Sequence, residues 1–131
     1  MSWLRSLISG RTQPVGRRGE RLAAKWLAQR KYRILERNLP LVDDEADLVA
    51  LDPDGRTIVI VEVKTRISDQ IPPELAVTRT KQFRMTRLAA RLQRRSRFKD
   101  KPFRFDAIAV VLPQAGEPII RHHPGAFESR W

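Results

Sequence analysis

The run TIVIVEVK at residues 57–64 constrains the fold more than any other segment of the chain. Its apolar residues are almost all β-branched, which is typical of a strand in the interior of a sheet. The sequence DPDG at residues 52–55 is typical of a tight turn between two strands. Residues 46–51 are therefore expected to form the preceding strand, which the turn folds back against residues 57–64 as a hairpin.

The rest of the chain alternates between helical and extended patterns. Apolar residues recur at helical spacing in two segments, which predicts one helix at residues 16–31 and another at residues 74–97. Pro40 is expected to end the strand that follows the first helix. The full set of further strands is expected at residues 32–38, 103–112 and 119–123. The resulting order, α-β-β-β-α-β-β, predicts an α/β fold with a mixed β-sheet and flanking helices.

Length and composition limit the class of protein. A chain of 131 residues has the size of one domain, which is expected at residues 14–127, after an irregular N-terminal arm (1–13) and before a C-terminal tail (128–131). The absence of cysteine excludes disulfides, thiolate metal sites and thiol catalysis. No apolar run approaches the roughly 20 residues of a membrane-spanning helix, and none near the N-terminus suits a secretion signal. A cytoplasmic protein is expected.

The charge is strongly positive and unevenly distributed. The chain has 26 Lys and Arg against 15 Asp and Glu, a formal net charge of +11, which favours a polyanion as partner. Residues 79–104 contain eleven basic residues and one acid, whereas residues 43–54 contain six acids and no base. A nucleic-acid surface beside a divalent-metal pocket accounts for both segments. A solubilising surface and two acidic turns account for them as well.

Three acids and a lysine are candidates for a metal site. Side chains alternate along a strand, so Glu62 and Lys64 are expected on one face, and the hairpin is expected to bring Asp47 beside Glu62. Two carboxylates suit Mg²⁺, which binds oxygen ligands, and Lys64 would activate water or neutralise charge on a phosphate. Glu20 is expected on the sheet-facing side of the first helix. The alternatives are an ordinary salt bridge for Glu62 and Lys64, and an acid that complements the helix dipole for Glu20.

Short motifs along residues 14–127 resemble known families. As they stand in this sequence, they are Gly16-x-x-Gly19-Glu20, Tyr32-x-Ile34-Leu35-x-x-Asn38, Glu45-x-Asp47-Leu48-Val49, Val61-Glu62-Val63-Lys64-Thr65-Arg66, Ala76-Val77-x-x-x-Lys81 and Arg104-Phe105-Asp106. Asp47 followed by Glu62-x-Lys64 resembles the signature of the PD-(D/E)xK nuclease superfamily. The whole set resembles the bacterial YraN-like family, a small group predicted to be endonucleases and related to archaeal Holliday-junction resolvases.

The resemblance implies a restriction-endonuclease-like fold and a set of roles. Asp47 and Glu62 would bind Mg²⁺ or Mn²⁺, Lys64 would be the catalytic lysine, and Glu20 would be an additional catalytic acid. The sequence departs from the family pattern at residues 44–47, where DEAD stands in place of the usual Gly-Glu-Ile-Asp. It also has alanine where the superfamily motif has proline.

The leading hypothesis is a Mg²⁺-dependent endonuclease that hydrolyses phosphodiester bonds in DNA, including branched or otherwise structured DNA. The alternative is a non-catalytic nucleic-acid-binding protein that retains the nuclease fold. DNA is the expected partner, a membrane is not, and a homodimer is compatible with these expectations. Contacts to the phosphate backbone are expected from Arg66, Lys81, Arg84, Arg87, Arg91, Arg94 and Arg95.

Two other polar features have structural interpretations. Asp106 lies in a predicted strand between apolar residues, so a salt bridge to Arg104 or Arg66 is expected there. His122 and His123 are adjacent in a predicted strand and point to opposite faces. They are expected on the surface and not as joint ligands of a metal.

Overall fold

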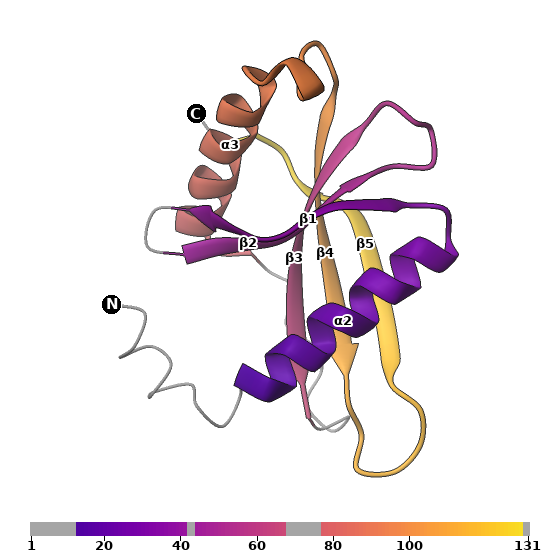
Figure 1. Cartoon of the computed structure of the whole chain (residues 1–131). Coiled ribbons are helices and arrows are strands. Elements are labelled where there is room, and N and C mark those ends of the chain that lie inside the picture. Colours follow the sequence, from indigo (N-terminus) through magenta and orange to yellow (C-terminus); the bar gives the residue numbers. More distant parts are fainter. Residues whose placement is uncertain (1–12, 42–43, 68–76, 130–131) are drawn as a thin grey trace.

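The computed structural model describes residues 13–41, 44–67 and 77–129, so the expected N-terminal arm, except for Gln13, lies outside the described residues (Figure 1). The elements are α2 (Gln13–Gln29), β1 (Arg33–Leu41), β2 (Asp44–Leu51), β3 (Ile58–Arg66), α3 (Arg79–Gln93), the short 3₁₀ helix η1 (Ser96–Phe98), β4 (Phe103–Val111) and β5 (Ile119–Phe127). This is the predicted order, α-β-β-β-α-β-β.

The strands of the described residues form one sheet whose spatial order, β1-β2-β3-β4-β5, follows the chain. β3 and β4 are parallel, and the other neighbouring pairs are antiparallel. A parallel pair needs a crossover connection, and α3 lies in the connection between β3 and β4. The predicted mixed sheet with flanking helices is confirmed.

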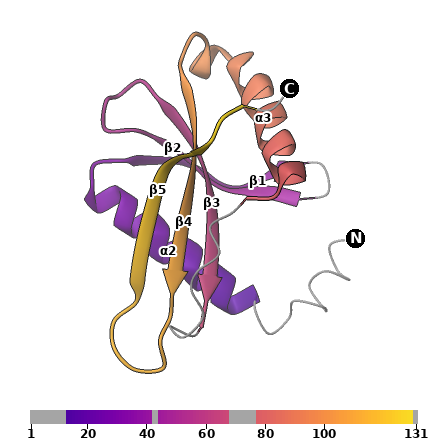
Figure 2. The same cartoon turned by 180° about the vertical axis from the view of Figure 1, so that it is seen from behind.

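The two helices α2 and α3 cover opposite faces of this sheet, so that α2 lies in front of the strands in Figure 1 and behind them in Figure 2. Leu27 of α2 packs with Val59 and Val61 of β3 in one apolar cluster. Met85 of α3 packs with Ile60 of β3 in the other. Alternate residues of β3 therefore enter two different cores, which explains why this strand is almost entirely apolar in its first half.

The turn between β2 and β3 is held by its own polar groups. The backbone N–H of Asp52 donates to the Thr57 carbonyl over 2.9 Å, and Gly55 takes a positive φ of 73°. Asp54 accepts hydrogen bonds from the hydroxyl and the backbone N–H of Thr57 and from the N–H of Arg56. These donors lower the pKa of Asp54 to about 2. Local chemistry therefore specifies the hairpin, as the sequence predicted.

Four strands, β1, β2, β3 and β5, are longer than predicted. Pro40 lies inside β1 and pairs with Glu45 of β2, so the prediction that it ends the strand is wrong. β1 is an edge strand, where a residue without a backbone N–H is tolerated. β5 continues to Phe127 because that residue pairs with Phe105 of β4, and the two rings stack with centroids 4.7 Å apart.

The second helix is shorter than predicted. Residues 74–76 lie outside the described residues, and Val77 and Thr78 precede α3. The Thr78 hydroxyl accepts a hydrogen bond from the N–H of Lys81 over 3.2 Å, which is an N-cap contact. At the other end the chain leaves α3 after Gln93 and enters η1, where Phe98 is buried.

Candidate functional site

β2 and β3 pair along only part of their length. Their register runs from Leu51 opposite Ile58 to Leu48 opposite Val61, although β2 begins at Asp44 and β3 continues beyond Val61. In Figure 1, β1 and β2 turn across the view whereas β3, β4 and β5 run down it. β2 and β3 therefore separate at the level of Asp47 and Glu62, the expected metal ligands.

Asp47 lies at this separation. Its Oδ2 accepts a hydrogen bond of 2.7 Å from the backbone N–H of Val63, so a side chain replaces the next backbone acceptor of the ladder. Burial raises the pKa of Asp47 well above its usual value, and the negative charges of Glu62 and Glu20 raise it further. The Val63 N–H and the Lys81 ammonium act in the opposite direction. We call the group Glu20, Asp47 and Glu62 the acidic opening.

Glu62 and Lys64 share one face of β3 by strand alternation. This is the face that Ile60 presents to the core under α3, and a lysine of α3 reaches it. The Lys81 Nζ lies 3.3 Å from Glu62 Oε2 and donates to the Glu45 carbonyl oxygen over 2.8 Å. Lys64 is partly buried on the same strand. Asp47 binds the N–H of Val63, the residue after Glu62, and the charge of Glu62 raises the pKa of Asp47, so the two acids are near each other, with the Lys81 cation beside Glu62.

Glu20 approaches from the opposite layer. It is partly buried on α2, where burial raises its pKa, and the charges of Glu45 and Glu62 raise it as well. A close approach of α2 to β3 positions this part of the helix, because a Cβ on Gly19 would overlap the Thr65 side chain. α2 begins at Gln13 and has no acid in its first turn. Glu20 is therefore not the terminal acid that would complement the helix dipole.

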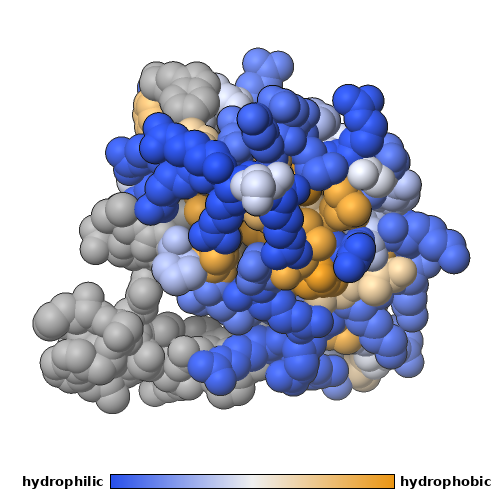
Figure 3. Space-filling view, turned by 45° about the horizontal axis from the view of Figure 1, so that its top comes forward, coloured by the Kyte–Doolittle hydropathy of each residue, from blue (hydrophilic) through white to orange (hydrophobic). Residues whose placement is uncertain are grey.

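Most of the predicted phosphate-binding residues lie on or just after α3. Arg87, Arg91, Arg94 and Arg95 are exposed, and Arg84 is partly buried. Figure 3, in which the top of Figure 1 comes toward the viewer, shows many hydrophilic side chains around a central hydrophobic area. Arg66 ends β3, where its guanidinium donates to the Thr65 carbonyl over 3.0 Å. Lys81 differs from the others because its side chain is only 11% exposed.

Comparison with known proteins places the chain among bacterial relatives. Over residues 19–110 it matches the uncharacterised protein family UPF0102. The chain belongs to this family. A UPF0102 protein of Pelobacter propionicus is 44% identical over 115 residues, which are 87% of this chain and 82% of the relative. Those of Trichlorobacter lovleyi (44% over 123 residues, 93% and 96% of the two chains) and Geobacter metallireducens (42% over 123 residues, 92% and 98%) are similar throughout.

A second polar network of this UPF0102 chain lies on the α2 side of the sheet. Asp106 is fully buried and accepts hydrogen bonds from the guanidinium of Arg104 over 2.8 and 2.9 Å, which confirms the predicted salt bridge. The same guanidinium donates to Asp52 over 2.7 Å and to the Tyr32 hydroxyl over 3.0 Å. His122 Nε2 lies 2.7 Å from Asp106 Oδ2.

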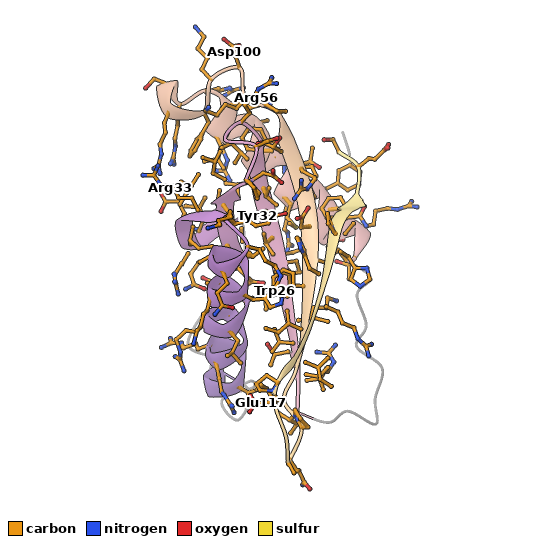
Figure 4. All side chains as sticks on the ribbon, turned by 90° about the vertical axis from the view of Figure 1, so that its right-hand side faces the viewer. Trp26, Tyr32, Arg33, Arg56, Asp100 and Glu117 are labelled. Carbon is orange, nitrogen blue, oxygen red and sulfur yellow. The ribbon has the colours of Figure 1, made fainter. Side chains whose placement is uncertain are left out.

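The position of His122 corrects one prediction. Its side chain is 8% exposed, and its ring makes edge-on contacts with Trp26 and Tyr32 at centroid distances of 5.4 and 5.8 Å. Figure 4 shows these two aromatic residues between α2 and the sheet. His123 is exposed as expected. The buried acid Asp106, which needs a partner, was the one sequence signal for this network.

Neither the acidic opening nor the network around Asp106 has three side chains arranged to hold one metal ion. Among the described residues, no group of three or more His, Cys, Asp or Glu residues is arranged to hold a metal ion. Asp47 and Glu62 are the two residues of the acidic opening that the sequence predicted as metal ligands. No helix in the described part of the chain is long and apolar enough to cross a membrane.

Proposed function

We propose that this chain is a divalent-metal-dependent endonuclease that hydrolyses phosphodiester bonds in DNA, including branched or structured DNA. The observation that carries the proposal is the meeting of Asp47 and Glu62 where β2 and β3 separate, with the pKa of Asp47 raised by burial and by Glu62. Carboxylates are seldom desolvated beside one another unless they bind a cation or serve in chemistry. The motif resemblance to PD-(D/E)xK nucleases, with their restriction-endonuclease-like fold, supports the same function.

The donor set fits Mg²⁺ or Mn²⁺. Both ions take oxygen ligands and keep several waters, so two carboxylates and nearby backbone oxygens suffice. Asp47 and Glu62 would hold the ion, and the hydrogen bond from Val63 fixes the orientation of the Asp47 carboxylate. The positive charge would offset the repulsion that raises the pKa of Asp47.

The bound ion and the other residues of the site would act on the phosphate, the attacking water and the DNA backbone. When bound, the ion supplies Lewis-acid chemistry at the scissile phosphate and lowers the pKa of a water molecule. Lys64 would neutralise charge that develops on the phosphate, and Glu20 would orient water from the α2 side. The exposed arginines along and after α3 would hold the phosphate backbone without reading its sequence.

The test is a cleavage assay with Mg²⁺ or Mn²⁺ on four-way-junction, flap and single-stranded DNA. Glu62→Gln and Lys64→Met should bind DNA like the wild type but cleave it at least roughly 100-fold more slowly, a loss of about 2.7 kcal/mol of transition-state stabilisation. Glu117→Gln makes the same chemical change on the exposed turn before β5 (Figure 4) and should cleave normally. If the wild type binds these DNAs but cleaves none, the nuclease proposal fails.

One contact favours the second candidate, a nucleic-acid-binding protein without catalysis. The Lys81 ammonium already lies 3.3 Å from Glu62 Oε2, so Glu62 has a partner in the absence of a metal. Under this alternative, Glu62→Gln would lower stability and leave DNA affinity unchanged, and no divalent ion would be required for any activity.

A further inference from the structure

Lys81 differs from the other basic residues of α3 because it is buried. Its side chain is 11% exposed, whereas Arg79 and Arg87 of the same helix are exposed. Counted over backbone and side chain together, Lys81 is one of the buried polar or charged residues in the described part of the chain, with Thr86 and Asp106. A lysine is almost never buried to this extent unless its charge is paired.

Two physical effects oppose a positive charge at this place. The hydrogen bond from the Lys81 N–H to the Thr78 hydroxyl caps α3, so Lys81 lies in the first turn of the helix. The positive end of the helix dipole disfavours a cation in that turn, and loss of hydration disfavours a buried ammonium. Negative groups around the ammonium must outweigh both effects.

The ammonium has two oxygen partners at the acidic opening. Its Nζ donates to the Glu45 carbonyl over 2.8 Å and lies 3.3 Å from Glu62 Oε2. Its charge also lowers the pKa of Asp47, against the larger effects of burial and of Glu62. A carbonyl oxygen and a carboxylate oxygen that converge on one cation are also the kind of ligands that Mg²⁺ and Mn²⁺ take.

We infer that Lys81 is a built-in cation of the acidic opening. Its ammonium fills the position between the Glu45 carbonyl and the Glu62 carboxylate, so the opening takes one divalent ion, held by Asp47 and Glu62, and not two. Lys81 is thus a positioning residue that keeps Glu62 in place before the ion binds, and its charge weakens the affinity for that ion. This inference rests on the proposed metal site and adds the number of ions and the residue that limits their affinity.

The test is a calorimetric titration of the full chain with MnCl₂ in the absence of DNA. Wild type is compared with Lys81→Met and with Lys81→Gln, which also removes the charge but keeps a donor for the Glu45 carbonyl and so stays informative if Lys81→Met does not fold. Lys99→Met makes the same substitution at an exposed lysine beyond η1. Wild type and Lys99→Met should bind one Mn²⁺, and both Lys81 variants should bind it at least about tenfold more tightly, about 1.4 kcal/mol.

Thermal unfolding gives a second readout. In EDTA, Lys81→Met should unfold at a lower temperature than wild type, because Glu62 loses its partner. Saturating Mn²⁺ should narrow that difference, because an ion that binds the folded state more tightly stabilises it more. A difference that is the same with and without Mn²⁺ would count against the inference.

The outcomes separate the inference from the proposed function. Unchanged or weaker Mn²⁺ affinity in both Lys81 variants, or two ions of comparable affinity in the wild type, would overturn the inference and leave the metal site in place. No Mn²⁺ binding by the wild type would overturn both. The expected gain in affinity, in a protein that cleaves no DNA, would support the inference and remove only the nuclease function.

Discussion

The backbone N–H of Val63 donates a hydrogen bond of 2.7 Å to Oδ2 of Asp47, just beyond the last paired residues of β2 and β3. A buried N–H without an acceptor would be costly, so the Asp47 side chain satisfies the end of the ladder at the point where the strands separate. The same carboxylate belongs to the acidic opening. Asp47 therefore has a structural role, as the hydrogen-bond acceptor of the Val63 N–H, and an electrostatic role, as a negative charge of the acidic opening.

Two substitutions separate the structural role of Asp47 from its electrostatic role. Asp47→Asn keeps an oxygen acceptor for the Val63 N–H and removes the charge, so in EDTA at neutral pH we expect it to equal or exceed the wild type in stability. Asp47→Ala removes the acceptor too and should be less stable than Asp47→Asn by about 1 to 3 kcal/mol. Chemical denaturation measures both, and only the wild type should gain thermal stability from Mn²⁺. An equal gain in either variant would place the metal elsewhere.

The arginines of α3 should account for much of the salt dependence of DNA binding. Affinity for duplex DNA falls with salt with a log–log slope of about −0.9 per phosphate neutralised. Replacing Arg84, Arg87 and Arg91 by alanine should flatten the slope by up to about 2.7 and lower the affinity for all DNA sequences by a similar factor. Fluorescence anisotropy at several salt concentrations measures both effects. A slope near zero in the wild type would contradict DNA binding altogether.

A matched control for that experiment lies on the opposite face of the sheet. Arg18, Arg21 and Lys25 are exposed on α2, and replacing them by alanine removes the same total charge. This variant should change the slope less than the α3 variant. Equal changes would mean that net charge, and not the α3 surface, determines affinity.

Two glycines of α2 allow a test of how the helix is positioned. Gly19→Ala would place a Cβ against Thr65, so we expect a loss of about 1 to 3 kcal/mol in the free energy of unfolding. Gly16→Ala meets nothing within 4 Å and should stabilise the helix by about 0.5 to 1 kcal/mol. Urea denaturation measures both. Thr65→Ala in the Gly19→Ala background should recover part of the loss, and no recovery would argue against this contact.

The parts of the site that local sequence determines could be predicted. The turn residues at 52–55 fix the hairpin, and its register then brings Asp47 to Glu62, which are 15 positions apart in the chain. Lys81 could not be placed in the same way, because its pairing depends on how α3 packs over the sheet. As a residue in a run of basic residues, it was expected on a phosphate-binding surface, a role that stays a prediction.

The second polar network shows the same limit. An acid between apolar residues of a strand predicted a salt bridge from Asp106 to Arg104 or Arg66, and the structure shows the one to Arg104. His122 belongs to β5, which lies beside β4 in the sheet. In the sequence, two adjacent histidines near the end of a predicted strand do not indicate that one of them is buried. Its contacts with Trp26 and Tyr32 arise only when α2 is packed on the sheet.

This network should make stability depend on pH in the acid range. Burial alone would raise the pKa of Asp106, but the hydrogen bonds from Arg104, His122 and the Gly125 N–H outweigh it, so the pKa lies below the usual value of 3.8. The folded protein therefore holds the Asp106 proton less tightly than the unfolded chain. The stabilisation is fully present at pH values above about 5 and is lost as pH falls below 3.8 through the pKa of the folded state.

Asp106→Asn tests this dependence. At pH 7 it should lower the free energy of unfolding by about 1 to 3 kcal/mol, because the partly buried Arg104 guanidinium loses a charged acceptor, although it keeps Asp52 and the Tyr32 hydroxyl. As the pH falls below 3.8, the wild type also protonates Asp106, so the difference between the two proteins should shrink. Urea denaturation at several pH values from about 7 to about 3 measures it. Asp100→Asn, at an exposed acid after η1, should stay within about 0.5 kcal/mol of the wild type throughout. A difference for Asp106→Asn that stays constant or grows in acid would show that the carboxylate charge is not what the network stabilises.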